Sequence, residues 1–235
     1  MNKKQAEHQQ ITLHKGHVIF GIITLIIVLI LYFFVDRTSS IFFNEVRHTK
    51  FYETFFIMQH SVNIMVSIGP YAYIYLLIML YLKRFFYFEQ FLFASCTSLF
   101  FANCMTNILK HIFGRYWTET FVDKNLSYIH NKTYGFDFFH GDIEHASFPS
   151  GHTTAIFAVM AILWIMYPKC RWIAVTWCTL VIVGLLGCDF HFPSDIVAGA
   201  FVGIISAFFI LHASQLFARN LKEHIEQVSD ESVKR

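Results

Sequence analysis

Side chains that can transfer protons, attack as nucleophiles or hold an anion gather in four stretches of this sequence. These stretches are residues 110–119, 134–145, 147–152 and 189–195. Each lies beside the end of a long apolar run, and the order of the runs puts all four at the same membrane level. The stretch 134–145 contributes Asp137, His140, Asp142, Glu144 and His145, which we interpret mainly as solvated loop residues. The other three have spacings that suggest specific chemistry.

The run Pro149-Ser150-Gly151-His152 precedes an apolar segment and predicts the start of a helix. Serine is a good N-cap, and glycine lets another group approach the backbone closely. The free amides and the helix dipole then form a cradle for an anion such as phosphate. A histidine at this point can give a proton to a leaving oxygen. Taken alone, the motif also fits a capped helix with an interfacial histidine.

His191 and Asp195 are four residues apart, so one helical turn places them on the same face. A carboxylate bonded to one ring nitrogen fixes the tautomer and leaves the other nitrogen free as a nucleophile or base. An ordinary hydrogen bond that closes a tight hairpin fits this pair equally well. Lys110 and Arg115 end a hydrophobic run, where cations often snorkel to the interface. A phosphate at the same level would also explain them.

The composition predicts the elements that position these residues. Only 14% of the 235 residues are charged and 55% are hydrophobic, with 28 Phe. Ordinary soluble domains carry about 25% charged residues, so soluble and disordered classes are excluded. A net charge of +2 gives no basis for nucleic-acid binding. The five cysteines show no metal-ligand pairing such as CxxC. The sequence therefore predicts an integral membrane protein.

Apolar runs predict an all-α bundle of six transmembrane helices in a single domain, residues 1–235. The expected spans cover about 18–35, 64–82, 85–109, 150–167, 172–188 and 195–218. Apolar residues also recur at helical spacing between Ser39 and Gln59, which favours an interfacial helix after the first span over a packed loop. Lys and Arg concentrate in both tails and in the turns at 83–84 and 169–171. The positive-inside rule then places both termini in the cytoplasm and the four polar stretches outside.

The ordered set Lys110…Arg115, Pro149-Ser150-Gly151-His152 and His191-xxx-Asp195 resembles the type-2 phosphatidic-acid phosphatase superfamily. That superfamily contains six-helix integral lipid phosphatases and soluble vanadium haloperoxidases. The resemblance implies a lipid phosphatase of the plasma (inner) membrane that works without metal or cofactor. His191 would attack phosphorus, Asp195 would orient it, and His152 would protonate the leaving oxygen. Lys110, Arg115, Ser150 and Gly151 would hold the phosphate oxygens.

Two positions depart from the family pattern. Its first motif has Arg-Pro where this chain has Trp117-Thr118, and its third has an arginine at the position of Leu185. A lipid-binding or lipid-transport protein that has lost turnover is therefore an alternative, and a vanadate enzyme a more distant one. A further alternative is a membrane protein whose polar helix ends have no function. This interpretation requires the three ordered motifs to be a coincidence. The sequence leaves open which lipid phosphate is bound and the oligomeric state.

Overall fold

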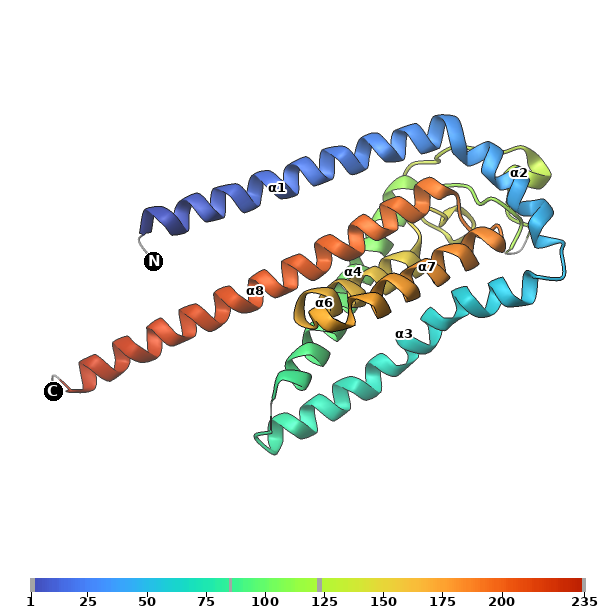
Figure 1. Cartoon of the computed structure of the whole chain (residues 1–235). Helices are drawn as coiled ribbons and strands as arrows, with labels where there is room; N and C mark the ends of the chain where they lie inside the picture. Colours follow the sequence, from blue (N-terminus) through green and yellow to red (C-terminus); the bar gives the residue numbers. More distant parts are fainter. Residues whose placement is uncertain (1–2, 85, 122–123, 234–235) are drawn as a thin grey trace.

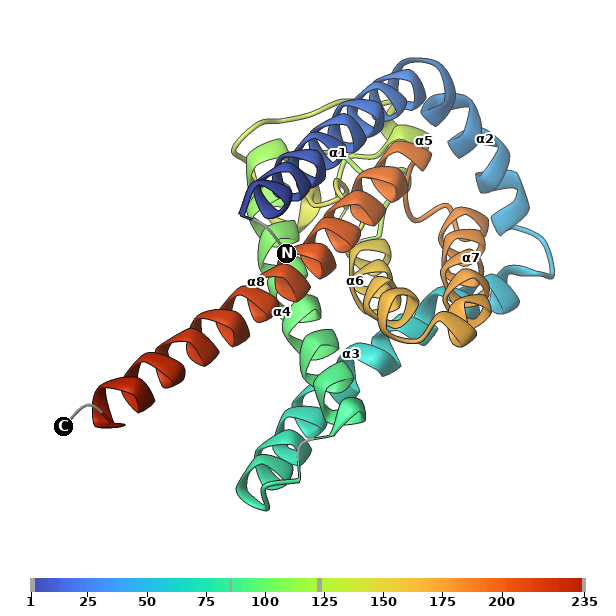
Figure 2. The same ribbon diagram turned by 60° about the vertical axis from the view of Figure 1, so that its left-hand side comes forward.

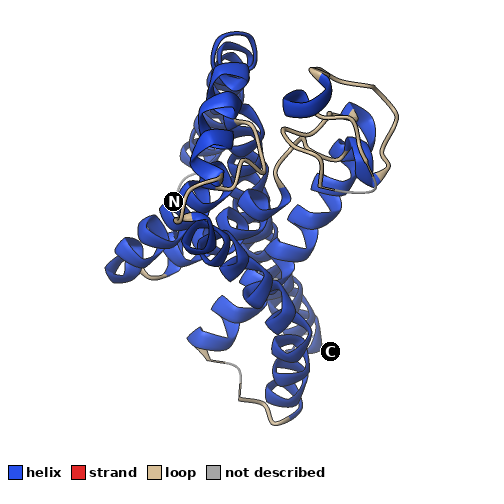
Figure 3. Cartoon of the chain, turned by 90° about the vertical axis from the view of Figure 1, so that its right-hand side faces the viewer, coloured by secondary structure: helices blue, strands red, loops and turns tan. Residues whose placement is uncertain are grey.

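A computed structural model of the chain describes residues 3–84, 86–121 and 124–233, and side chains only between residues 16 and 217. Among these residues the structure contains helices and loops but no strand (Figures 1 and 3). The all-helical expectation is therefore confirmed. The elements, in chain order, are α1 (Lys3–Ile30), η1 (Leu31–Val35), α2 (Asp36–Arg47), α3 (Tyr52–Tyr81), α4 (Tyr87–Phe113), α5 (Tyr128–Asn131), η2 (Ile143–His145), α6 (Gly151–Met166), η3 (Pro168–Cys170), α7 (Arg171–Gly187) and α8 (Pro193–Val233).

Five helical segments in the described residues are long and apolar enough to cross a membrane. They cover Gly16–Arg47, Tyr52–Tyr81, Tyr87–Phe113, Pro168–Gly187 and Pro193–Phe217. The remaining expected span, 150–167, corresponds to α6, whose 16 residues extend over only about 24 Å. A hydrocarbon core of roughly 30 Å needs about 20 residues. The count of six spans is therefore not confirmed by helix length.

The first span does not end where the sequence suggested. Helix α1 continues through a π-helical turn, η1, directly into α2. A turn at residues 48–51 then separates α2 from α3. The interfacial helix expected between Ser39 and Gln59 is thus not confirmed, because its first half belongs to α2 and its second half to α3. Helix α2 instead buries Asp36 and Ser40.

Helix α6 lies in the middle of the bundle, with α8 on one side and α7 on the other (Figure 2). Its central place explains why a 16-residue helix is nearly all apolar and largely buried. Helix α8 can approach α6 closely because it presents two glycines to it. A Cβ added to Gly199 would lie 2.5 Å from the Ser150 carbonyl oxygen, and one added to Gly203 2.5 Å from the Thr154 carbonyl oxygen.

The ends of the bundle differ in what they carry. Figure 1 shows both chain termini at one end, and the long loop between α4 and α6 at the other, next to α2. The α7–α8 connection lies at this loop-bearing end as well. All four polar stretches of the sequence therefore meet at one end of the bundle. The basic tails are outside the residues whose side chains are described.

Candidate active site

The predicted site residues come from three helix ends that converge. Lys110 lies in the last turn of α4, and Arg115 follows Gly114, the left-handed residue that ends this helix. Ser150 caps the start of α6. His191 lies two residues before the start of α8, and Asp195 lies in the first turn of that helix. The backbone amide of Ser150 donates to the Asp195 carbonyl oxygen at 3.1 Å, so the starts of α6 and α8 are directly joined.

The start of α6 has the capped first turn that the predicted anion cradle requires, and anion binding there stays a prediction. The buried Ser150 hydroxyl accepts hydrogen bonds from the Thr153 amide at 3.4 Å and the Thr153 hydroxyl at 3.0 Å. Because the Ser150 amide is bonded to Asp195, the amides available in the first helical turn are those of Gly151 and His152. A Cβ added to Gly151 would meet only the Lys110 Cε atom, at 3.9 Å. The lysine side chain therefore passes directly over the cradle.

His191 and Asp195 are adjacent, as their spacing predicted. The Nδ1 atom of His191 lies 3.5 Å from Asp195 Oδ2, and both side chains are buried. The same carboxylate oxygen accepts from the Ser147 hydroxyl at 2.7 Å and the Phe192 amide at 3.1 Å. Burial lowers the pKa of His191, and although Asp195 opposes this, the nearby cations reinforce it. The ring is therefore neutral at neutral pH, as a nucleophile must be.

His152 and Lys110 face the same space. The Nε2 atom of His152 is buried and has no hydrogen-bond partner among the described residues. His152 also lies within electrostatic range of His191, Lys110 and His60. The Lys110 ammonium donates to the Ala146 carbonyl oxygen. The structure thus brings a free imidazole nitrogen, a cation and a second imidazole together.

Arg115 is in a different position from the one expected of a phosphate ligand. Its side chain is fully buried behind Asp195, and both of its terminal nitrogens are bonded to protein oxygens. One terminal nitrogen donates to Asp195 and, at 2.6 Å, to the Ser194 hydroxyl. The other donates to Asp36 at 2.7 Å and to the Tyr134 hydroxyl at 3.2 Å. Phosphate binding by Arg115 stays a prediction, and these bonds favour another role.

Aromatic rings enclose this guanidinium, with the Phe192 ring centroid 4.4 Å from its central carbon. Burial lowers the pKa of Arg115, but the carboxylates of Asp195 and Asp36 outweigh it and the net direction is upward. The guanidinium therefore stays charged. Removing one partner of such a buried ion pair typically costs about 3–5 kcal/mol, because the other charge is left unpaired.

Asp36, which directly follows the first expected span, 18–35, was not identified from the sequence. The available signal was a lone carboxylate at the end of a membrane helix, since such groups are rare and usually functional. The π-helical turn before Asp36 is a second indication that only the structure provides.

The two departures from the family pattern have different surroundings. Trp117 lies in the site: its ring is 5.3 Å from the His191 ring, and the Lys110 ammonium is 5.6 Å from it. Leu185 is fully buried in the hydrophobic cluster between α3, α6 and α7. An aromatic wall thus replaces one expected arginine, and apolar core replaces the other.

Several other polar residues of the four stretches are paired around the site. The buried Asp189 carboxyl accepts from the Ser40 hydroxyl, and burial raises its pKa to about 8 despite this bond. Glu119 pairs with Arg47 at 3.0 Å. His140 and His145 pair locally, with Asp137 and Asp142 respectively. Among the described residues, no three His, Cys, Asp or Glu side chains gather in an arrangement that could hold a metal.

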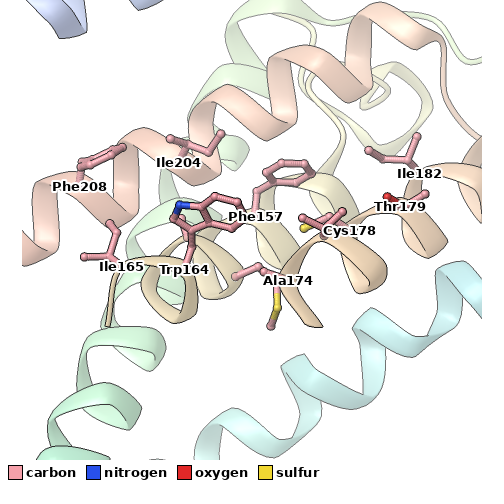
Figure 4. A pocket seen from close by; sticks show the side chains of 12 residues that line it. Phe157, Trp164, Ile165, Ala174, Cys178, Thr179, Ile182, Ile204 and Phe208 are labelled. Carbon is pink, nitrogen blue, oxygen red and sulfur yellow. The ribbon is translucent and has the colours of Figure 1, made fainter. Parts of the chain in front are cut away.

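An apolar groove of about 440 Å³ lies between α6, α7 and α8 (Figure 4). Phe157 and Trp164 belong to its α6 side, Cys178 and Ile182 to α7, and Phe208 to α8. Phe157 is five residues along α6 from His152, so the groove begins just below the level of the site.

One protein family and several curated proteins are similar in sequence to this chain. A family model described as the PAP2 superfamily matches residues 91–219. A lipid A 1-phosphatase of Rhizobium etli is 31% identical over 131 residues, which cover 52% of this chain and 49% of that protein. A lipid A 1-phosphatase of Rhizobium johnstonii is 32% identical over 127 residues, covering 51% of this chain and 45% of that protein.

A bacitracin transport permease protein, BcrC, of Bacillus licheniformis is 32% identical over 71 residues, or 29% of this chain and 35% of that protein. The chain thus spans at most about half the length of each of these relatives. No solved structure shows significant similarity to it.

Proposed function

The chain belongs to the PAP2 superfamily, and on that premise we propose that it is a membrane lipid phosphatase. The observation that carries the proposal is the meeting of His191, His152 and Lys110 at one end of the bundle. His191 is neutral, buried and next to a carboxylate, and His152 has a free ring nitrogen. The substrate would be a lipid phosphate monoester or pyrophosphate.

The chemistry would proceed through a phosphohistidine. The Nε2 atom of His191 attacks phosphorus while Asp195 holds Nδ1 and stabilises the charge that develops on the ring. His152 gives a proton to the leaving lipid oxygen as its bond to phosphorus breaks. Water then attacks the phosphohistidine, and the neutral His152 accepts the proton of that water. Inorganic phosphate leaves and both rings return to their starting state.

The phosphate oxygens would be held by Lys110 and by the start of α6. Charge on the non-bridging oxygens must be stabilised in phosphoryl transfer. The Lys110 side chain passes over Gly151, with its Cε atom 3.9 Å from a Cβ added there, next to the first turn of the helix. Ser150 would contribute as the cap that holds this turn in place. We assign Arg115 to Asp195 rather than to phosphate, because its terminal nitrogens are already bonded to protein oxygens.

Lipid A carrying a 1-phosphate is the first substrate to test, because two relatives are described as lipid A 1-phosphatases. Phosphatidic acid, phosphatidylglycerophosphate and undecaprenyl pyrophosphate share the required chemistry. The lipid tail would lie among the membrane-spanning helices, with the headgroup at the level of His191.

In this proposal the chain crosses the plasma (inner) membrane six times, with α6 as the short fourth span among the other five. Both termini are then cytoplasmic and the active site faces outward. The support is the position of the basic turns at 83–84 and 169–171, which lie at the opposite end of the bundle from the site loops (Figure 1).

The test is phosphate release by the purified full chain in detergent micelles with each of the four lipids. We expect release from at least one lipid, and none from the His191→Ala variant. A panel without any release, or release that survives this substitution, would overturn the proposal. Binding of labelled lipid without hydrolysis would instead support the lipid-binding alternative, which the intact set of His191, His152 and Asp195 does not favour.

A further inference from the structure

The first helix reaches the nucleophile through an unbroken chain of buried charges. Asp36, at the start of α2, contacts Arg115 at 2.7 Å, and Arg115 contacts Asp195, which lies 3.5 Å from His191. The side chains of Asp36, Arg115 and Asp195 all have 0% exposure. We infer that Asp36 is a positioning residue, which acts through Arg115 to fix the carboxylate of Asp195 and so the ring of His191.

The charges of this chain balance only when all its members are present. Asp36 and Asp195 supply two negative charges, while Arg115 supplies one positive charge between them. Lys110 supplies a second positive charge within electrostatic range of Asp195. Buried charges need partners, so Arg115 is fixed between the two carboxylates. If either carboxylate moved away, a buried charge would be left without a partner.

A second connection runs from Asp36 to the helix that carries Asp195. The Ser194 amide donates to Asp36 Oδ1 at 3.0 Å, and the Ser194 hydroxyl donates to Asp36 Oδ2. Ser194 lies in the first turn of α8, where backbone amides lack partners within the helix. Asp36 therefore caps α8 from a separate helix, and a negative charge at this end also matches the helix dipole.

The geometry at His191 shows why such positioning matters. The 3.5 Å between Nδ1 and the carboxylate is longer than an ordinary N–H···O hydrogen bond, and the buried Nδ1 atom has no hydrogen-bond partner among the described residues. Asp195 Oδ2 is also shared with the Ser147 hydroxyl and the Phe192 amide. Without Asp36, Arg115 is free to turn both terminal nitrogens toward Asp195. This movement draws the carboxylate away from the ring and leaves the nucleophile poorly oriented.

The π-helical turn η1 places Asp36 in this position. The Asp36 amide bonds to the Leu31 carbonyl oxygen across the wider turn. The Tyr32 carbonyl oxygen accepts the Tyr134 hydroxyl at 2.6 Å, and that hydroxyl in turn accepts from Arg115 at 3.2 Å. The first helix is therefore joined to Arg115 by its backbone as well as by Asp36. His191 is therefore correctly oriented only when the first helix is packed against Arg115.

The decisive variant is Asp36→Asn, which keeps the size and one acceptor but removes the charge. Ser40→Ala is the matched control, because Ser40 also joins α2 to the α7–α8 connection but bonds to Asp189 instead. This inference rests on the proposed phosphatase function, so the experiment has one readout that needs activity and one that does not. Thermal unfolding in micelles reports how much of each variant is folded.

The first readout is phosphate release from micelles of lipid A 1-phosphate, or of the panel lipid that the wild type hydrolyses fastest. We expect Asp36→Asn to lower kcat about 10- to 100-fold per folded molecule, with KM changed less than about twofold, as for loss of an orienting partner. We expect Ser40→Ala to keep kcat within about twofold. Equal kcat in the wild type and Asp36→Asn, or equal losses in both variants, would overturn the inference.

The second readout is the proton NMR resonance of the His191 Nδ1–H group, identified by its disappearance in His191→Ala. We expect Asp36→Asn to shift or broaden this resonance and Ser40→Ala to leave it unchanged. A resonance that is identical in the wild type and Asp36→Asn contradicts the inference even if the lipid panel shows no turnover. Failure of phosphate release alone counts against the proposed function and leaves this readout to decide the role of Asp36.

Discussion

The contact of α8 with the start of α6 at Gly199 gives a sharp test of how the site is held. A Cβ added here would lie 2.5 Å from the Ser150 carbonyl oxygen and 3.2 Å from both Thr153 Cβ and Thr154 Oγ1. Since real Cβ contacts are essentially never under 3.0 Å, Gly199→Ala must separate these atoms by about 0.5 Å. Because Ser150 begins the anion cradle, the shift falls on the proposed phosphate site.

The magnitude follows from this displacement. A misplacement of 1 Å in an active site can cost about 10²-fold in rate, so we expect about a tenfold loss of kcat. Overpacking lowers the free energy of unfolding by about 1–3 kcal/mol. The better helix propensity of alanine offsets up to about 1 kcal/mol of this loss. Gly203→Ala is the matched comparison. Its Cβ would lie 2.5 Å from the Thr154 carbonyl oxygen, one turn further from the cradle.

The assay is phosphate release per folded molecule, together with thermal unfolding in the same micelles. We expect both variants to be similarly destabilised, but only Gly199→Ala to lose kcat. Gly69→Ala should keep kcat and lose no stability, because nothing lies within 4 Å of an added Cβ there and alanine has the better helix propensity. If Gly199→Ala keeps its kcat, or if Gly203→Ala loses as much, the reasoning that connects this helix contact to the cradle is wrong.

Three further predictions concern charge and orientation. Lys110 lowers the pKa of His191, so Lys110→Met should raise KM and move the acid limb of kcat/KM to higher pH; a limb that does not move contradicts this. Asp189 has a folded pKa of about 8, above an unfolded value of about 3.9, so the folded state binds the extra proton and stability falls as pH rises between these values. Asp189→Asn should therefore lose less thermal stability than the wild type between pH 5 and pH 8, and equal losses would refute this. In a background whose five cysteines are replaced by serine, a membrane-impermeant maleimide should label Lys132→Cys but not Lys83→Cys in intact cells, and the reverse pattern would invert the proposed topology.

The sequence by itself determined what depends on local chemistry. Long runs without charge specify helices that cross a membrane, because unpaired polar groups and charges are costly in hydrocarbon. The apolar lengths therefore predicted both ends of α4 and α7 to within about four residues, and the start of α8 to within two. They did not predict that α3 begins at Tyr52 rather than Ile64, or that the first helix continues through η1 into α2. Ser150 as a helix cap and the proximity of His191 to Asp195 are also local, since each depends on residues three or four apart.

Only the tertiary structure decided which partner each charged residue has. Asp36 and Arg115 are 79 residues apart, and Asp36 and Ser194 are 158 apart, so no local pattern connects them. From the sequence, Arg115 is a cation at a helix end, equally suited to phosphate, to lipid headgroups or to a carboxylate. A buried charge is stable only where an opposite charge or hydrogen-bonding group reaches it, and the fold brings Asp36 and Asp195 to Arg115. Tertiary contacts also explain why the first helix continues past its expected end, through η1 into α2. This path brings Asp36 to Ser194 at the start of α8 and Ser40 to Asp189 in the α7–α8 connection.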